Sequence, residues 1–203
     1  MKAMWIAALA AVAGTAQAAT VVNVPGADGG AGTVEAVSYP VAAGTVLTFT
    51  NAVTLDLAAG DYLLTPTVVG RTAGATFGGW NFQSTVGGSW GNHFVAGADL
   101  GNGRYQVLLD ATTVPEPTCK NHFCAYDSEQ QAIDAWLATP AFRLRLDSAT
   151  RVGFVSADYY LPDNLGGISF VVSSVPEPAS AALLAAGALL LGWRLRQARG
   201  GAS

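Results

Sequence analysis

Short stretches in which apolar and polar residues alternate constrain the fold of this 203-residue chain more than any other feature. Residues 53–57, 142–146 and 168–173 each place an apolar side chain at every second position. Because successive side chains of a β-strand point to opposite faces, this period predicts strands with one face buried against a second layer. The 24 Gly supply turns between such stretches. We therefore predict an all-β protein, an antiparallel, jelly-roll-like β-sandwich of about nine or ten strands.

One segment has helical periodicity instead. Ser128 and Gln131 stand at the spacing of a capping box, which begins many helices. The apolar residues that follow share one helix face: Ala132, Ile133, Trp136 and Leu137. Pro140 marks the end of the segment, because proline disrupts a helix interior. The sandwich should therefore carry one short inserted helix.

The N-terminus has the three parts of a secretory signal peptide. Met1-Lys2 is a short positive start, and residues 3–13 are apolar. Ala16-Gln17-Ala18 supplies small residues before a cut, so we expect signal peptidase to cleave between Ala18 and Ala19. An uncleaved anchor is the alternative, and the short apolar stretch disfavours it. Residues 1–18 are thus predicted to be a signal peptide.

The C-terminus combines a proline motif, an apolar run and an arginine cluster. Val175, Pro176, Glu177 and Pro178 precede the run from Ala179 to Trp193, in which Ser180 is the one polar residue. As a helix the run would span roughly 22 Å, which is marginal for a membrane crossing. The basic residues that close the chain should stay on the cytoplasmic side: Arg194, Arg196 and Arg199.

Residues 175–199 resemble the PEP-CTERM sorting signal, a segment also described as the ice-binding protein C-terminal domain. The resemblance implies that an exosortase recognises the precursor in the inner membrane of a Gram-negative bacterium and removes its transmembrane tail. The mature protein would then be secreted to the cell surface or extracellular matrix, where exopolysaccharide and biofilm are its expected surroundings. A C-terminal anchor that is never cut is the alternative. The internal Val114-Pro115-Glu116-Pro117 has polar residues after it and is predicted to be a loop.

The predicted mature domain, residues 19–174, is acidic. Six basic and thirteen acidic residues give it a formal charge of −7. An acidic domain without basic clusters repels phosphate, so nucleic acid is excluded as an expected partner. Cations fit this charge better.

The two cysteines, Cys119 and Cys124, are expected to form a disulfide, because export places them in an oxidising compartment. The bond would close a small loop. A zinc site formed by these cysteines with His122 and His93 is the alternative, but a spacing of four residues between the cysteines is unusual for zinc.

Two patterns in the sequence are compatible with an enzyme, but neither is specific, and we expect a non-enzymatic protein. Residues 87–91 match the Gly-x-Ser-x-Gly pattern of a hydrolase nucleophile, with His93 nearby, but a strand–elbow–helix context is not expected there. Asp158 and Asp163 could serve as paired carboxylates of a polysaccharide hydrolase, yet nothing in their spacing selects them. A non-enzymatic exported protein is the preferred hypothesis.

The segment before the last predicted strand could hold calcium. Asp158, Asp163 and Asn164 carry the carboxylate and amide oxygens that hard cations prefer, and Gly166-Gly167 follows. Residues 158–170 resemble the last-loop motif of small calcium-dependent galactose-binding bacterial lectins, which implies a calcium ion that holds a sugar. The alternative is an Asx-turn that needs no metal. A lectin-like adhesin is therefore the second hypothesis.

Six aromatic residues in two separate segments of the sequence suggest a further possibility. They could form a sugar-binding platform, although aromatic residues at alternate strand positions more often belong to a core. The residues in question are Trp80, Phe82, Trp90, Phe94, Tyr159 and Tyr160.

Overall fold

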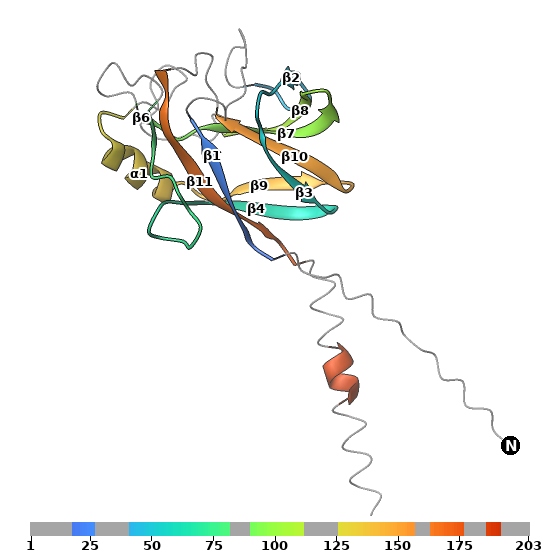
Figure 1. Ribbon diagram of the computed structural model, residues 1–203. Helices are drawn as coiled ribbons and strands as arrows, with labels where there is room; N and C mark the ends of the chain where they lie inside the picture. The colour runs from blue at the N-terminus through green and yellow to red at the C-terminus, as the bar shows by residue number, and fades with distance from the viewer. Residues whose placement is uncertain are drawn as a thin grey trace, which may run out of the picture. The chain divides into compact units, whose positions relative to one another are not determined.

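The computed structural model describes residues 18–26, 41–81, 90–111, 126–156, 163–176 and 186–191. Ala18–Ser174 form one compact unit. In its described part, eleven strands make two antiparallel sheets, and one helix is inserted between the eighth and ninth strands (Figure 1). The predicted all-β sandwich with one short helix is confirmed.

The first sheet is organised around the last strand of the unit. Its strand order is β6-β5-β11-β4-β9, and β1 pairs with β11 as well. The strands of this sheet are β1 (Thr20–Pro25), β4 (Gly60–Thr67), β5 (Trp80–Asn81), β6 (Trp90–Gly91), β9 (Phe142–Leu146) and β11 (Leu165–Ser174).

The second sheet has the order β2-β8-β7-β10-β3. Its strands are β2 (Val46–Thr48), β3 (Val53–Leu57), β7 (Phe94–Gly101), β8 (Arg104–Asp110) and β10 (Thr150–Ser156). Strands that follow each other in sequence pair in the β7–β8 hairpin, whereas β10 lies between β7 and β3.

Aromatic rings join the two sheets. Phe170 of β11 stacks on Phe94 of β7, with ring centroids 4.7 Å apart, and meets Phe154 of β10 at 5.3 Å. All three side chains are fully buried. Full burial of such a side chain contributes about 1.5–3 kcal/mol, so this contact between β7, β10 and β11 is a main source of the sandwich's stability.

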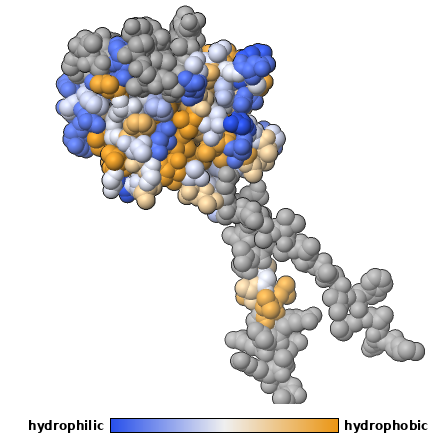
Figure 2. Space-filling view, viewed as in Figure 1, coloured by the Kyte–Doolittle hydropathy of each residue, from blue (hydrophilic) through white to orange (hydrophobic). Residues whose placement is uncertain are grey.

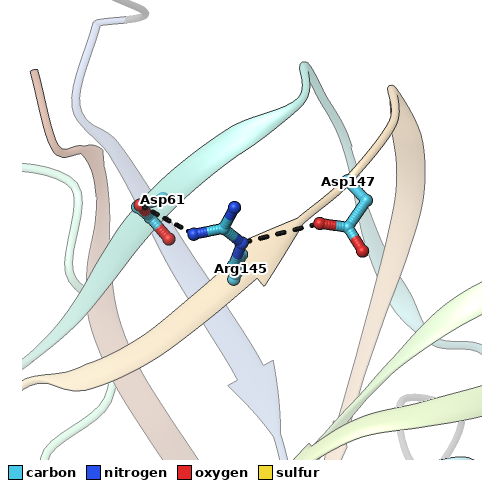
Figure 3. A network of polar contacts seen from close by, with 3 residues as sticks. All are labelled: Asp61, Arg145 and Asp147. Atoms are coloured by element: carbon cyan, nitrogen blue, oxygen red, sulfur yellow. Dashed lines mark hydrogen bonds and ion pairs between the residues drawn. The ribbon is translucent and has the colours of Figure 1, made fainter. Parts of the chain in front are cut away.

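The predicted alternation is confirmed most clearly in β9. Its side chains are buried and exposed in turn, with Phe142, Leu144 and Leu146 inside. Arg145 faces solvent between Asp61 of β4 (3.9 Å) and Asp147 (3.5 Å) (Figure 3). Because the arginine side chain is 76% exposed, these ion pairs contribute little to stability. Charge on this edge strand also opposes pairing with another chain.

Helix α1 (Glu129–Ala138) begins at the predicted cap. The Ser128 hydroxyl accepts a hydrogen bond from the Gln131 backbone N–H at 3.3 Å. The Gln131 side chain accepts from the Asp127 N–H, one residue before the position that a standard capping box uses. The indole N–H of Trp136 donates to the carbonyls of Thr67 and Ser169, which fixes the helix to β4 and β11.

The two ends of the compact unit lie together. In the antiparallel pair of β1 and β11, Thr20 is opposite Val172, and Pro25 is opposite Gly167 (Figure 1). The start of β1 and the end of β11 therefore share one end of the sandwich, here called the terminal end. The opposite end, where β1 finishes and β11 begins, is called the loop end.

The C-terminal segment is described only at residues 186–191, which form one short helix. Its leucines, Leu189, Leu190 and Leu191, are exposed, and most of the segment is apolar (Figure 2). Among the described helices, none has the length and apolar character required for a membrane crossing. Most of the predicted run from Ala179 to Trp193 and the three arginines lie outside the described residues.

Candidate functional site

Buried polar side chains gather at the loop end. Here Gly26 donates its N–H to the carbonyl of Gly166 at 2.8 Å, and Asn81 of β5 is opposite Leu165 of β11. The end of β10 is close by, because the Ser156 hydroxyl donates to the carbonyl of Pro25 at 3.4 Å. The polar residues buried in this region are Asn81, Asn92, His93, Ser156 and Asn164. Buried polar groups are normally hydrogen-bonded, so any that is not needs an explanation.

Asp163 and Asn164 carry the clearest anomaly. Asn164 is only 3% exposed, and neither its amide oxygen nor its amide nitrogen has a hydrogen-bond partner. The adjacent Asp163 has one carboxylate oxygen, Oδ1, that is also buried without a partner. An unpaired buried polar group costs about 1–3 kcal/mol. Three such atoms on two neighbouring residues make this the place at the loop end where a bound water or ligand would gain most.

The backbone beside these residues is held rigidly. Gly166 has φ +76°, and a Cβ at this position would collide with the carbonyl oxygen of Gly79. Gly167 donates its N–H to the same oxygen at 3.0 Å. Only glycine combines this conformation with such close contact, so the start of β11 is locked against the strand β5. Asn164 therefore lies two residues before a backbone position, Gly166, whose conformation is fixed.

The three unpaired atoms define what a ligand must offer. Two are oxygens that attract a cation or a hydrogen-bond donor, and the third is an N–H donor. Calcium takes oxygens at about 2.3–2.6 Å, closer than the 2.7–3.0 Å of a hydrogen-bonded water. Both oxygens are of the kind that hard cations take as ligands. The amide N–H would remain for a hydroxyl or water held beside the cation.

The predicted calcium ligands are only partly described. Asp163 and Asn164 lie at the loop end as adjacent residues, while Asp158 is outside the described residues. Among the described residues, no three His, Cys, Asp or Glu side chains lie close enough together to hold a metal ion. The described residues thus include two of the three predicted ligands, fewer than the six to eight oxygens that calcium takes.

His93 is a packed ring of the interior. It is 2% exposed, and its imidazole meets the Trp80 indole edge-on at a centroid distance of 4.7 Å. For the zinc hypothesis, Cys119, His122 and Cys124 lie outside the described residues, and so does the predicted disulfide. For the esterase hypothesis, Gly91 belongs to β6 and the next described element is the strand β7, which is not the context that a nucleophile elbow requires.

Two members of the suggested aromatic platform belong to the core. Trp80 and Phe94 are fully buried, so neither offers a face to a sugar. Phe94 packs against Phe170 and Phe142, and Trp90 is only partly buried beside α1. The platform is wrong for Trp80 and Phe94, whose side chains belong to the main core cluster. Phe82, Tyr159 and Tyr160 lie outside the described residues.

Asn92 was not identified from the sequence. Its amide nitrogen donates to the carbonyl of Ala132 in α1 at 2.6 Å, while its amide oxygen is buried without a partner. This hydrogen bond joins Asn92 to a residue of α1 that lies 40 positions away in the chain. Its position between Gly91 and His93 carries no motif that could have predicted this contact.

Among the described residues, Tyr105 has a phenol whose pKa departs clearly from its ordinary value. Burial raises the pKa of its phenol, the nearby Asp99 carboxylate raises it further, and Arg151 opposes the shift. The ring stacks on Phe49 at 4.5 Å in the separate core of the second sheet. This shift is therefore a consequence of packing and does not mark the loop end as a catalytic site.

Comparisons with known proteins bear on the C-terminus alone. Residues 174–197 match the model of the PEP-CTERM protein-sorting motif. No curated protein and no solved structure matches the chain. The match starts at the last residue of β11 and covers the proline motif, the apolar run and two of the three arginines. The chain therefore carries a PEP-CTERM sorting signal.

Proposed function

We propose that this chain, which carries a PEP-CTERM sorting signal, is a non-enzymatic exported protein of the cell envelope or exopolysaccharide matrix. The motif match over residues 174–197 is the observation that carries the proposal. Such a signal implies recognition by an exosortase and a precursor that is held at the membrane and processed for export to the cell surface. The acidic sandwich is then the part that acts outside the cell.

The arrangement of the compact unit supports this proposal. The predicted signal-peptidase site, Ala18/Ala19, and the proline motif at Val175-Pro176 both adjoin the terminal end, because Thr20 is opposite Val172. Both segments can be removed without disturbing any interior strand. The loop end, with its unpaired polar atoms, is at the opposite end of the same unit, away from both predicted cleavage sites.

The intact mass of the protein recovered outside native cells tests the processing. We expect a chain that starts at Ala19 and ends close to Pro176–Pro178. A mass that includes the apolar run and Arg194 would show an uncut membrane protein and refute the proposed processing. A variant with Pro176 and Pro178 both replaced by Ala should accumulate as the longer species, since the motif would be lost.

The absence of enzymatic activity is tested separately. We expect no release of new reducing ends from the host's exopolysaccharide across the pH range in which the protein is folded. A bell-shaped pH–rate profile would instead show a pair of catalytic carboxylates and support the polysaccharide-hydrolase hypothesis. Asp158, one member of that pair, lies outside the described residues.

The unpaired oxygens of Asp163 and Asn164 favour a second candidate function, calcium-dependent carbohydrate binding. In this proposal calcium takes both oxygens among its six to eight ligands, and a sugar hydroxyl is another of them and accepts a hydrogen bond from the amide N–H of Asn164. Immobilised glycans should bind the protein in calcium and release it in chelator. The Asp163→Ala variant should lose binding, and the matched surface variant Asp147→Ala should keep it. Full binding by Asp163→Ala would exclude this site.

A further inference from the structure

The sorting segment begins inside the folded domain. Its match starts at residue 174, and Ser174 is the last residue of β11, opposite Tyr62 of β4. Ser173 is opposite Leu63 of the same strand. No spacer therefore separates the sheet from Val175 and Pro176.

The strand that adjoins the motif is also the one that completes the core. β11 pairs with β1 on one side and with β4 and β5 on the other. Its inward residues Ile168 and Phe170 are fully buried, and Phe170 contacts rings of the opposite sheet. β11 is the last of the described strands, so the sheet cannot be completed before the chain up to Ser174, where the sorting match starts, is available.

The final residues of β11 are held from one side only. The pairing with β1 ends at Thr20 and Val172, so Ser173 and Ser174 keep β4 as their one described neighbour. Strand ends with few partners open locally at little cost in free energy. The end of β11 is thus the part of the strand that can most easily leave the sheet.

We propose that the processing protease and β4 compete for residues 173–174, so that the tail is cut only when the end of β11 opens. The inference rests on the proposed removal of the tail by an exosortase. Peptide-binding proteins commonly hold an extended segment through its backbone, and residues already paired with β4 cannot offer theirs on that side. The cleavage is hydrolysis of one backbone amide, in which water leaves a carboxylate on the domain and an amine on the tail.

The rate of processing then depends on the fraction of molecules in which the strand end is open. A site that is exposed only part of the time binds with an affinity reduced by that fraction. Folding and processing are consequently coupled: a chain whose β11 has not docked is cut readily, and a docked chain is cut in proportion to its opening.

A spacer inserted in the full-length protein tests the competition. Six residues of alternating Gly and Ser between Ser174 and Val175 should raise the processing rate in native cells about tenfold by pulse–chase, which corresponds to about 1.4 kcal/mol. The same spacer between Asn102 and Gly103, in the exposed β7–β8 turn, should leave the rate unchanged. Equal rates for the two insertions would refute the competition.

A second variant changes the rate in the opposite direction. Ser173→Val increases β-propensity opposite Leu63 without altering the sorting motif, so it should slow processing. An unchanged or faster rate in this variant would contradict the inference. If the wild-type chain never loses its tail, the proposed function fails together with this inference. If it loses the tail at a rate that neither variant alters, only this inference fails.

Discussion

Replacing Asn164 with leucine tests whether the loop end is built around a ligand. Leucine has a similar size and no polar atoms. In the present structure Asn164 contributes two unpaired buried atoms, each costing about 1–3 kcal/mol. Without a ligand, Asn164→Leu should therefore raise the free energy of unfolding by about 1–3 kcal/mol, after allowance for imperfect packing of the new side chain. For a domain of this size, that is a rise of about 2–4 °C in Tm per kcal/mol.

In the presence of calcium, the wild type should instead be at least as stable as Asn164→Leu. A ligand that binds only the folded state at a hundred times its Kd stabilises the protein by about 2.7 kcal/mol. The wild-type protein should gain this stability, and Asn164→Leu should gain none because an oxygen ligand is lost. Thermal unfolding by calorimetry, with calcium and with chelator, measures both differences. Leu144→Ala, a core change in β9, is the control: it should lower Tm in both conditions and keep the calcium response.

Two results would refute this reasoning. If Asn164→Leu is less stable than the wild type in chelator, the amide has partners in solution and the anomaly at the loop end does not exist. A second result would be that Asn164→Leu is more stable than the wild type in chelator but calcium does not change the Tm of the wild type. The polar atoms would then be unpaired without binding a cation. Calcium-dependent carbohydrate binding at this site would then be excluded.

Three further changes probe the fold. Trp136→Phe removes the indole donor to the carbonyls of Thr67 and Ser169 and leaves a small cavity, so unfolding in denaturant should show a loss of about 2–3 kcal/mol. The raised pKa of Tyr105 means that the folded state holds the phenol proton more strongly than the unfolded state. This group should therefore leave stability unchanged at pH values below its ordinary pKa of 10.0, and stability should fall as pH rises above that value. Tyr105→Phe should weaken this loss of stability at alkaline pH. Arg145→Ala should change stability by less than about 1 kcal/mol in the same assay, because both of its ion pairs are exposed.

Local patterns predicted the local structure well. The alternation in residues 142–146 is the burial pattern of β9, since a strand's period is a property of the backbone itself. Ser128 caps α1 as expected, because a cap depends on neighbours three residues away. The same reasoning could not assign Trp80 and Phe94 to the core rather than to a surface platform. That assignment depends on which face of each strand meets the opposite sheet.

The candidate site, too, could be predicted only in part from the sequence. The types of Asp163 and Asn164 and their place before glycines suggested an oxygen-rich site from the sequence. Their burial without partners appears only once β11 has paired with β5 and the backbone at Gly166 is locked against Gly79. Asn92 gives no sequence signal, because its partner Ala132 is 40 residues away in the chain.

By itself, the sequence determined the sorting address and the strand-rich character of this protein, since both are encoded in contiguous residues. Only the tertiary structure decided that β11 lies between β1 and β4, that the two ends of the compact unit adjoin the same end of the sandwich, and that Asn164 is enclosed at the other. These features depend on pairings between residues as far apart as Thr20 and Val172. Such pairings are selected by the burial of the whole core, which no local pattern encodes.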